Sequence, residues 1–266
     1  MRKNGGFFMN YQLYYFGRNL LLFFCGLAFL ISGSPGKDNI KTIAHTGFCT
    51  QNLENTEAAF IGAVKNGSDG IETDVRFTKD GIPVTWHDSD IEYTDSTRLV
   101  VAEHTYEELA AKPIKNPING EEAYLCTLEH YFEICRDNNM ICFLDLKGDY
   151  TDEQVTVVME MGRRIHSLDM IIPQSSDVEN IKKVRALYPE QHIMLTYGRL
   201  QFEKDLDYTV CFDYNFDIDC DYTVANKKMI KEFHDKGLLF GVFTCNTKLS
   251  QSYACYLGVD YMESDV

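Results

Sequence analysis

The residues of this chain whose types and spacing could do chemistry gather in its first third. Two histidines, His45 and His87, enclose a pair of carboxylates, Glu72 and Asp74. Residues 71–75 alternate apolar and polar side chains like a strand, so Glu72 and Asp74 are predicted to project from the same face. Histidines can move protons and paired carboxylates can hold a divalent metal. This set suits metal-assisted hydrolysis of a phosphodiester.

A hairpin is expected to bring the second histidine to the carboxylates. Asp80-Gly81 is a strong hairpin signal, and a turn centred there pairs positions whose numbers sum to about 161. Asp74 is then expected opposite His87, within reach of direct cross-strand contact. Two like charges on an apolar wall raise one another's pKa unless a cation lies between them. A divalent metal would resolve this repulsion.

Each of these signals alone has an ordinary explanation. A Glu-x-Asp pair is usually a solvated face of a strand, and a lone histidine is usually a hydrogen-bonded structural residue. Here, however, His45, the carboxylate pair and His87 all fall at the ends of short apolar segments. Barrel enzymes build their active sites at strand ends, so the combination favours an enzyme.

Short segments along the chain also carry a resemblance to a known family. They read IAHTG (43–47), LENT (53–56), AF (59–60), GSDGIETDV (67–75), TKDG (78–81), PV (83–84) and HD (87–88). In order, spacing and residue type they resemble the glycerophosphodiester phosphodiesterase family. The later segments LDLK (144–147), FTCN (243–246) and GVD (258–260) through Ser264-Asp265 are similar to further family strands.

The resemblance implies hydrolysis of a glycerophosphodiester to glycerol 3-phosphate and an alcohol. It makes His45 and His87 the general acid/base pair and makes Glu72, Asp74 and Asp145 the ligands of a divalent metal. Hard oxygen ligands favour magnesium or calcium. Attack by water and attack by a neighbouring glycerol hydroxyl through a cyclic phosphate both remain open.

The resemblance also implies supporting roles for four further residues. Lys147 would contact the phosphate, and Thr46 stands at the position of a second phosphate contact. Glu54 and Asp88 would support the site from behind the residues that touch the substrate. The sequence leaves open whether Arg76, on the same strand face as Asp74, supplies a further cation.

The chain departs from the family pattern at several positions. Thr46 replaces an arginine, a planar phosphate-binding fork that threonine cannot imitate. Asp145 replaces a glutamate and is one methylene shorter, while Leu53 and Phe243 replace a proline and a tryptophan. Two alternatives therefore stand beside the hydrolase: a phospholipase D-like or lyase member acting on a larger lipid, and a non-catalytic phosphate-binding relative.

The predicted fold is α/β, a TIM-type (β/α)8 barrel with a hairpin return strand over 83–87 and a short insertion over the site. Strands alternating with helices indicate such a barrel or a doubly wound sheet, and the resemblance favours the barrel. Helices are predicted over 53–65, 153–165, 178–187 and 224–236. The predicted strands are 41–47, 70–77, 140–147, 169–174, 192–197, 208–212, 238–244 and 259–262. The segment 90–125, with a short helix over 106–111, is interpreted as a lid or specificity loop within the domain 37–266.

The N-terminus has the pattern of a targeting segment. Residues 1–36 combine a basic start with a twelve-residue apolar core at 20–31 and small residues after it, the signature of a secretory signal peptide. An uncleaved membrane anchor is the alternative. The protein is therefore expected to be secreted or attached to the outer face of the cell membrane. The eight cysteines after this segment permit disulfides, although Cys142 and Cys245 lie in apolar strands and are expected to be reduced.

Charge narrows the choice of partner. The formal net charge is −15, and a polyanion is repelled by nucleic acid and by anionic lipid surfaces. A nuclease is therefore disfavoured, and a small soluble phosphodiester is the expected partner. No protein partner is evident, and membrane attachment would rest on the N-terminal segment.

Overall fold

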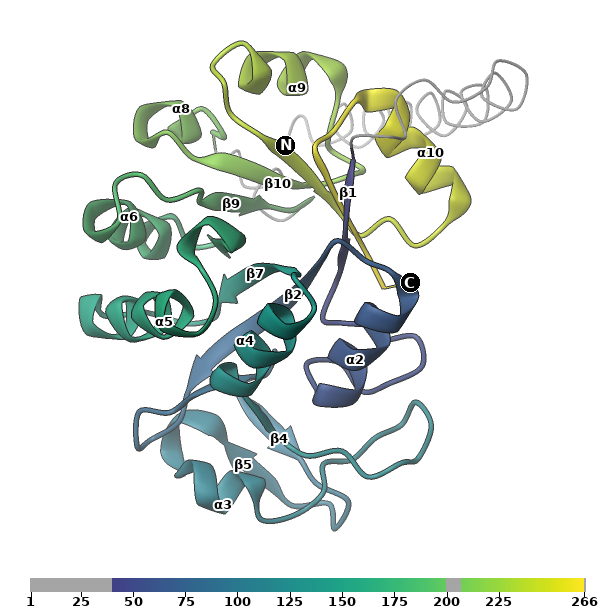
Figure 1. Ribbon diagram of the computed structural model, residues 1–266, viewed down its shortest axis with the longest axis vertical. Helices are drawn as coiled ribbons and strands as arrows, with labels where there is room; N and C mark the ends of the chain where they lie inside the picture. The colour runs from purple at the N-terminus through teal and green to yellow at the C-terminus, as the bar shows by residue number, and fades with distance from the viewer. Residues whose placement is uncertain (1–39, 200–206, 266) are drawn as a thin grey trace, which may run out of the picture.

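The computed structural model describes residues 40–199 and 207–265 and shows a closed barrel of parallel strands surrounded by helices (Figure 1). The barrel closes because β1 pairs in parallel with both β12 and β2. The predicted (β/α)8 fold is therefore confirmed, and the doubly wound alternative is wrong. The eight parallel strands are β1 (Lys41–Ala44), β2 (Gly70–Phe77), β7 (Ile141–Leu146), β8 (Ile171–Ser175), β9 (Met194–Tyr197), β10 (Asp217–Asp221), β11 (Phe240–Phe243) and β12 (Tyr261–Ser264).

Helices between the strands form the outer layer. They are α2 (Glu57–Asn66), α4 (Leu128–Asp137), α5 (Asp152–Ile165), α6 (Val178–Leu187), α8 (Val210–Tyr214), α9 (Lys227–His234) and α10 (Lys248–Leu257), with 3-10 turns at Val101–Glu103 and Leu168–Met170. Five of them are capped by side chains that accept backbone N–H bonds, which supplies partners that a helix start otherwise lacks. The capping residues are Thr127, Thr151, Asp177, Asn226 and Thr247. Helices α4 and α10 were not predicted.

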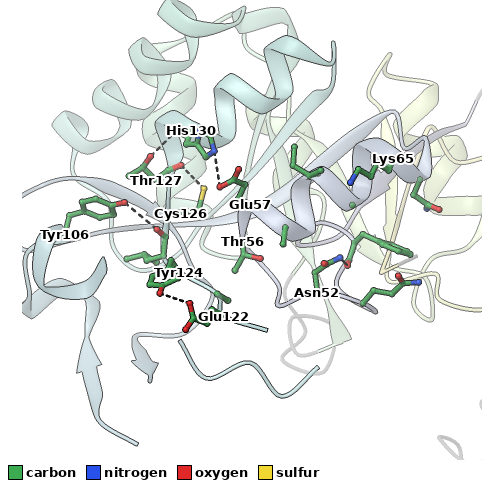
Figure 2. A pocket seen from close by; sticks show the side chains of 18 residues that line it. Asn52, Thr56, Glu57, Lys65, Tyr106, Glu122, Tyr124, Cys126, Thr127 and His130 are labelled. Carbon is green, nitrogen blue, oxygen red and sulfur yellow. Dashed lines mark hydrogen bonds and ion pairs between the residues drawn. The ribbon is translucent and has the colours of Figure 1, made fainter. Parts of the chain in front are cut away.

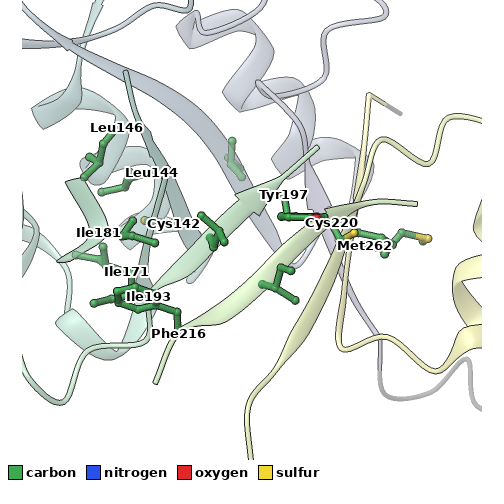
Figure 3. Close-up of a cluster of buried hydrophobic side chains, with 14 of the residues drawn as sticks. Cys142, Leu144, Leu146, Ile171, Ile181, Ile193, Tyr197, Phe216, Cys220 and Met262 are labelled. Atoms are coloured by element: carbon green, nitrogen blue, oxygen red, sulfur yellow. The ribbon is translucent and has the colours of Figure 1, made fainter. Parts of the chain in front are cut away.

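The main core lies between the strands and the helices. It includes the buried side chains of Leu144, Ile171, Ile193 and Phe216 (Figure 3). A smaller apolar cluster of Ile43, Phe143, Ile172 and Met194 belongs to the barrel strands themselves. Apolar burial on both faces holds the strand ends, and therefore the site, in fixed positions.

One predicted strand is wrong. The apolar stretch 208–212 is predicted to be a strand, but Val210–Tyr214 form helix α8, and the barrel strand is β10, Asp217–Asp221. Tyr208 and Phe212 instead pack against Phe233 of α9, with ring centroids 6.2 and 5.0 Å away. In β10, acidic residues alternate with Ile218 and Cys220, so its sequence lacks an apolar run.

The predicted register of the hairpin after β2 is off by one residue. Strand β3 (Pro83–Thr85) pairs antiparallel with β2, Val75 opposite Thr85. The loop has three residues, 79–81, and closes with Thr78 N–H donating to the Ile82 carbonyl at 3.0 Å. Gly81 has φ 78°, the left-handed residue that such a loop needs. Asp74 therefore lies beside Trp86 and not opposite His87.

The segment after β3 folds into a small packed unit and not an open loop. It contains β4 (Asp90–Glu92), which pairs with β5 (Arg98–Val100), helix α3 (Tyr106–Ala110) and β6 (Cys126–Thr127), which pairs with β3. In Figure 1 this unit projects beyond the ring of helices. Its own core comprises Leu53, Val84, Trp86, Ile91, Tyr93, Val101, Leu109, Ile114, Ala123 and Leu125.

This second core predicts a stability difference inside the insertion. Ile91 is fully buried, whereas Ile118 is 49% exposed. Ile91→Ala is expected to destabilise the protein by about 2–5 kcal/mol, the usual range for deleting a buried aliphatic side chain, and Ile118→Ala by less than about 0.5 kcal/mol. Denaturant unfolding of both variants measures the difference. Equal effects would show that the insertion lacks a core of its own.

Candidate active site

Three carboxylates from the neighbouring strands β2 and β7 converge. The register places Asp74 directly beside Asp145, and one oxygen from each of Glu72, Asp74 and Asp145 lies within 4.8 Å of the others. All three residues are buried. Burial and the charge of Asp74 raise the pKa of Glu72 to about 8. Three converging carboxylates that are buried from solvent are suitable ligands for a divalent cation that prefers oxygen.

Asn55 orients the central carboxylate of this cluster. Its side-chain Nδ2 donates to Asp74 Oδ2 at 2.7 Å, while its Oδ1 accepts from Asp74 N–H and from the Thr73 hydroxyl. Asn55 is fully buried and has φ 57°, a conformation that asparagine tolerates better than most residues. No role is predicted for Asn55 from the sequence, although it lies in the segment LENT (53–56) that carries the resemblance.

Lys147 already places a positive charge among the carboxylates. Its Nζ lies 2.6 Å from Asp145 Oδ2 and 3.0 Å from Asp74 Oδ1. Burial works against the charge of this ammonium, but Asp145 and Asp74 outweigh it and raise the pKa of Lys147. The side chain is 23% exposed, so it borders the accessible side of the cluster. A phosphate approaching from that side would meet this ammonium.

His45 is held by a chain of polar contacts from the last strand. Its Nδ1 lies 2.8 Å from Asp265 Oδ1, and Asn246 binds the same aspartate through its side-chain amide and by accepting Asp265 N–H. Burial opposes protonation of His45, but the Asp265 hydrogen bond and the charges of Glu72, Asp265 and Asp74 raise its pKa to about 9. Bonding Nδ1 to Asp265 leaves Nε2 for chemistry.

His87 has a more open setting. Its Nδ1 lies 2.8 Å from Asp88 Oδ1, and the two side chains are 53% and 71% exposed. Arg76 donates from Nε and Nη2 to the His87 backbone carbonyl at 2.8 and 2.6 Å. Arg76 therefore fixes the backbone that carries His87.

Two further residues of the predicted site, Thr46 and Glu54, have different surroundings. Thr46 is buried, its hydroxyl donates to the His45 carbonyl, and its N–H donates to Glu72 Oε2 at 2.9 Å. It thus positions Glu72, and its phosphate contact stays a prediction. Partial burial and the charge of Asp74 raise the pKa of Glu54, while His87 and His45 lower it. Glu54 therefore lies within electrostatic reach of both histidines.

The cysteines do not add chemistry to the site. The disulfides that the sequence permitted do not form among the eight cysteines of the described residues. Cys142 and Cys245 are buried as predicted. Burial raises the pKa of the Cys49 thiol to about 11, which leaves it un-ionised near neutrality and unsuited to act as a nucleophile.

A pocket of about 890 Å³ lies to the side of this site (Figure 2). It is bordered by α2, the segment 122–127 and the start of α4, and its polar side chains include Lys65, Tyr106 and His130. None of the predicted site residues lines it. The carboxylate cluster, with its histidines and lysine, remains the better candidate because it has the groups that phosphoryl chemistry needs.

The His45–Asp265 pair predicts a pH dependence of the metal-free protein. A histidine whose folded pKa is about 9, against 6.5 unfolded, adds stability that is full below pH 6.5 and is lost as pH rises through about 9. Asp265→Asn is expected to lower the pKa of His45 and to weaken this decline. NMR titration of the imidazole in both proteins measures it, and an unchanged His45 titration would contradict the pairing.

Comparisons with known proteins agree with the fold and with the predicted family resemblance. The family model described as the glycerophosphoryl diester phosphodiesterase family matches residues 45–266. Two solved structures share the fold: a phosphodiesterase of Oleispira antarctica in complex with the product sn-glycerol-3-phosphate (TM-score 0.75, 21% identity, 88% of this chain and 94% of that one), and a glycerophosphodiester phosphodiesterase of Parabacteroides distasonis (TM-score 0.70, 24% identity, 86% and 94%).

Among curated proteins, glycerophosphodiester phosphodiesterase 1 of Bos taurus is 35% identical over 136 residues, which are 48% of this chain and 40% of the relative. The chain thus aligns with less than half the length of that relative. A glycerophosphodiester phosphodiesterase of Caldanaerobacter subterraneus is 29% identical over 162 residues, 58% of this chain and 65% of the relative.

A (β/α)8 barrel with carboxylates, histidines and a lysine at its strand ends defines a phosphodiesterase-type site. The chain belongs to the glycerophosphoryl diester phosphodiesterase family, as the match over most of its length shows. The predicted family resemblance is thereby confirmed.

Proposed function

We propose that this protein is a metal-dependent hydrolase of glycerophosphodiesters that releases glycerol 3-phosphate and an alcohol. The observation that carries the proposal is a buried cluster of Glu72, Asp74 and Asp145 joined by two histidines, each paired with its own aspartate. In support, the Oleispira relative with the same fold was solved with sn-glycerol-3-phosphate as its product.

The environments of the two histidines suggest a division of labour. His45 holds its proton tightly because carboxylates surround it, so we assign it the general acid that protonates the departing alcohol oxygen from Nε2. His87 is solvent-exposed and paired with Asp88, so we assign it the general base that takes a proton from the attacking water or hydroxyl. Two imidazoles in different environments suit an acid and a base in one step.

The remaining groups bind the charge of the phosphate. Glu72, Asp74 and Asp145 would hold magnesium or calcium, which when bound neutralises phosphoryl oxygens and orients the diester. Lys147 presents its ammonium beside Asp145 and Asp74 and offers a point charge to a phosphate oxygen. A small soluble diester remains the proposed substrate because the chain carries a net charge of −15.

We also propose that residues 1–36 direct the protein to the secretory route, as a cleaved signal or as an anchor on the outer membrane face. This segment lies outside the described residues. Within the part of the chain that the structure describes, no helix is long and apolar enough to cross a membrane. N-terminal sequencing of the protein recovered from medium and from membranes distinguishes the two forms, and recovery only from the cytoplasm would contradict both.

The decisive test of the proposed function is release of glycerol phosphate from glycerophosphocholine by the full chain, with magnesium, with calcium and with a chelator. We expect turnover that needs the added ion. Absence of turnover with choline, ethanolamine, serine and inositol diesters alike would overturn the proposal and favour the binding-only alternative. Thr46→Arg then tests whether the absent arginine is responsible.

A further inference from the structure

Four polar side chains form one layer across the barrel interior, which we call the inner layer: Glu72, Gln174, Asp219 and Glu263. They lie on β2, β8, β10 and β12, which alternate around the closed sheet. Alternate strands of such a barrel contribute side chains to a common interior layer, normally of bulky apolar residues. The other four strands supply the layer beneath: Ile43, Phe143, Met194 and Gly241. The inner layer therefore places polar groups where a barrel usually packs apolar ones.

The inner layer contains oxygen atoms that nothing in the described residues satisfies. Both carboxylate oxygens of Asp219, Glu263 Oε1 and Gln174 Oε1 are buried and have no hydrogen-bond partner there. The three residues are at most 2% exposed. Buried polar atoms in folded proteins are nearly always paired, because leaving them unpaired costs free energy. All four of these oxygen atoms can accept a hydrogen bond or bind a cation, so the missing partner is a cation or a proton donor.

Gly241 makes the space that Asp219 occupies. A Cβ at position 241 would lie 2.8 Å from Asp219 Oδ1 and 3.3 Å from Met194 Cε. Any side chain on β11 at this level would therefore displace the carboxylate. The absence of a side chain at Gly241 therefore lets the Asp219 carboxylate lie inside the barrel.

The inner layer adjoins the carboxylate cluster of the active site. One ligand atom from each of His45, Glu72 and Glu263 lies within 4.8 Å of the others. Glu72 therefore belongs both to the carboxylate cluster and to the barrel layer that holds the unpartnered oxygens.

We propose that the inner layer is a second cation site, in which a divalent ion binds between Glu263 and Asp219 with Gln174 Oε1 and the Glu72 carboxylate as further ligands. An all-oxygen set with several carboxylates suits magnesium, manganese or calcium. Glu72 lies in both sets and would join this inner ion to the ion held by Glu72, Asp74 and Asp145. The inner site goes beyond the proposed function, which needs only the ion held by Glu72, Asp74 and Asp145. Binding of the inner ion can be measured without turnover, so its test is separate from the test of the proposed function.

Manganese binding to the metal-free full chain tests the proposal, with bound and free ion counted by electron paramagnetic resonance. We expect two ions per wild-type chain and one for the double variant with Asp219→Asn and Glu263→Gln. We call the ion held by Glu72, Asp74 and Asp145 the outer ion. Asp74→Asn is expected to weaken binding of the outer ion and to leave binding of the inner ion unchanged. One ion per wild-type chain, lost in Asp74→Asn and kept in the double variant, would overturn the inner site.

Two measurements decide the question if the double variant fails to fold. Gly241→Ala keeps every ligand residue but crowds the Asp219 carboxylate, so we expect it to weaken binding of the inner ion at least about tenfold, which is ~1.4 kcal/mol, while the outer ion is retained. Anomalous scattering from wild-type crystals soaked in manganese should show a peak between Asp219 and Glu263. A peak only at Glu72, Asp74 and Asp145 would show that protons, and not a second ion, satisfy the inner layer.

Discussion

Replacing His45 by glutamine should reduce turnover of glycerophosphocholine by about 10²–10⁴-fold, the usual contribution of a general acid. The imidazole is held by Asp265 at 2.8 Å and its pKa is raised to about 9, so it carries a proton that glutamine cannot donate. Substrate binding should change little, because the phosphate charge is met by other groups. Steady-state kinetics with saturating magnesium measure kcat and KM separately.

The leaving group provides the control for this prediction. A nitrophenolate leaving group needs little protonation. His45→Gln should therefore slow hydrolysis of a nitrophenyl diester much less than hydrolysis of glycerophosphocholine. His192, paired with Asp217 at 3.1 Å before β9, offers a matched histidine away from the carboxylate cluster, and His192→Gln should leave both rates unchanged. Equal losses on both substrates would show that His45 is not the acid.

Asp145→Asn should produce the second large effect, on the dependence of activity on metal. Asp145 supplies one of three converging carboxylates and also pairs with Lys147 at 2.6 Å. Removing its charge weakens attraction for the ion, and we expect the magnesium concentration at half-maximal rate to rise at least about tenfold, equivalent to ~1.4 kcal/mol of binding free energy. Metal titration of activity and direct calorimetric binding measure it.

Lys147 supplies a test of opposite sign at the same cluster. Its ammonium lies between Asp145 and Asp74 and competes with a bound ion, so Lys147→Gln should tighten metal binding while raising KM for the diester. Asp169→Asn, an exposed aspartate at the far end of β8, is the neutral control. Unchanged metal affinity in Asp145→Asn would remove Asp145 from the ligand set.

Local patterns explain which parts of the fold and site could be predicted. Alternation along β2 predicted that Glu72 and Asp74 share a face, and both are buried on the cluster. Helix α6 was predicted with its observed ends, Val178 and Leu187, because its periodicity and its Asp177 cap are local signals. The hairpin was predicted, but its register was not, since a three-residue loop and a two-residue turn share the same Asp80-Gly81 signal.

The acidic interior was missed for a different reason. A strand is recognised from apolar residues, and β10 presents Asp219 to the barrel interior, so its sequence resembles a polar loop. For the same reason, the strand predicted over 259–262 ended before Glu263, which belongs to β12. Only the closed sheet shows that these acids are buried, at 1% exposure each, because burial depends on which other strands surround them.

By itself, the sequence determined the residues to which chemistry is assigned and most of the short strands that carry them, since both depend on residue types and spacings over a few positions. The tertiary structure alone decided how distant segments complete the site. Asp265 reaches His45 across a sequence separation of 220 residues because β12 closes the barrel against β1, and Asn246 in turn holds Asp265. Strand closure is a long-range packing result, driven by burial of apolar surface on both faces of the sheet, and no local spacing specifies it.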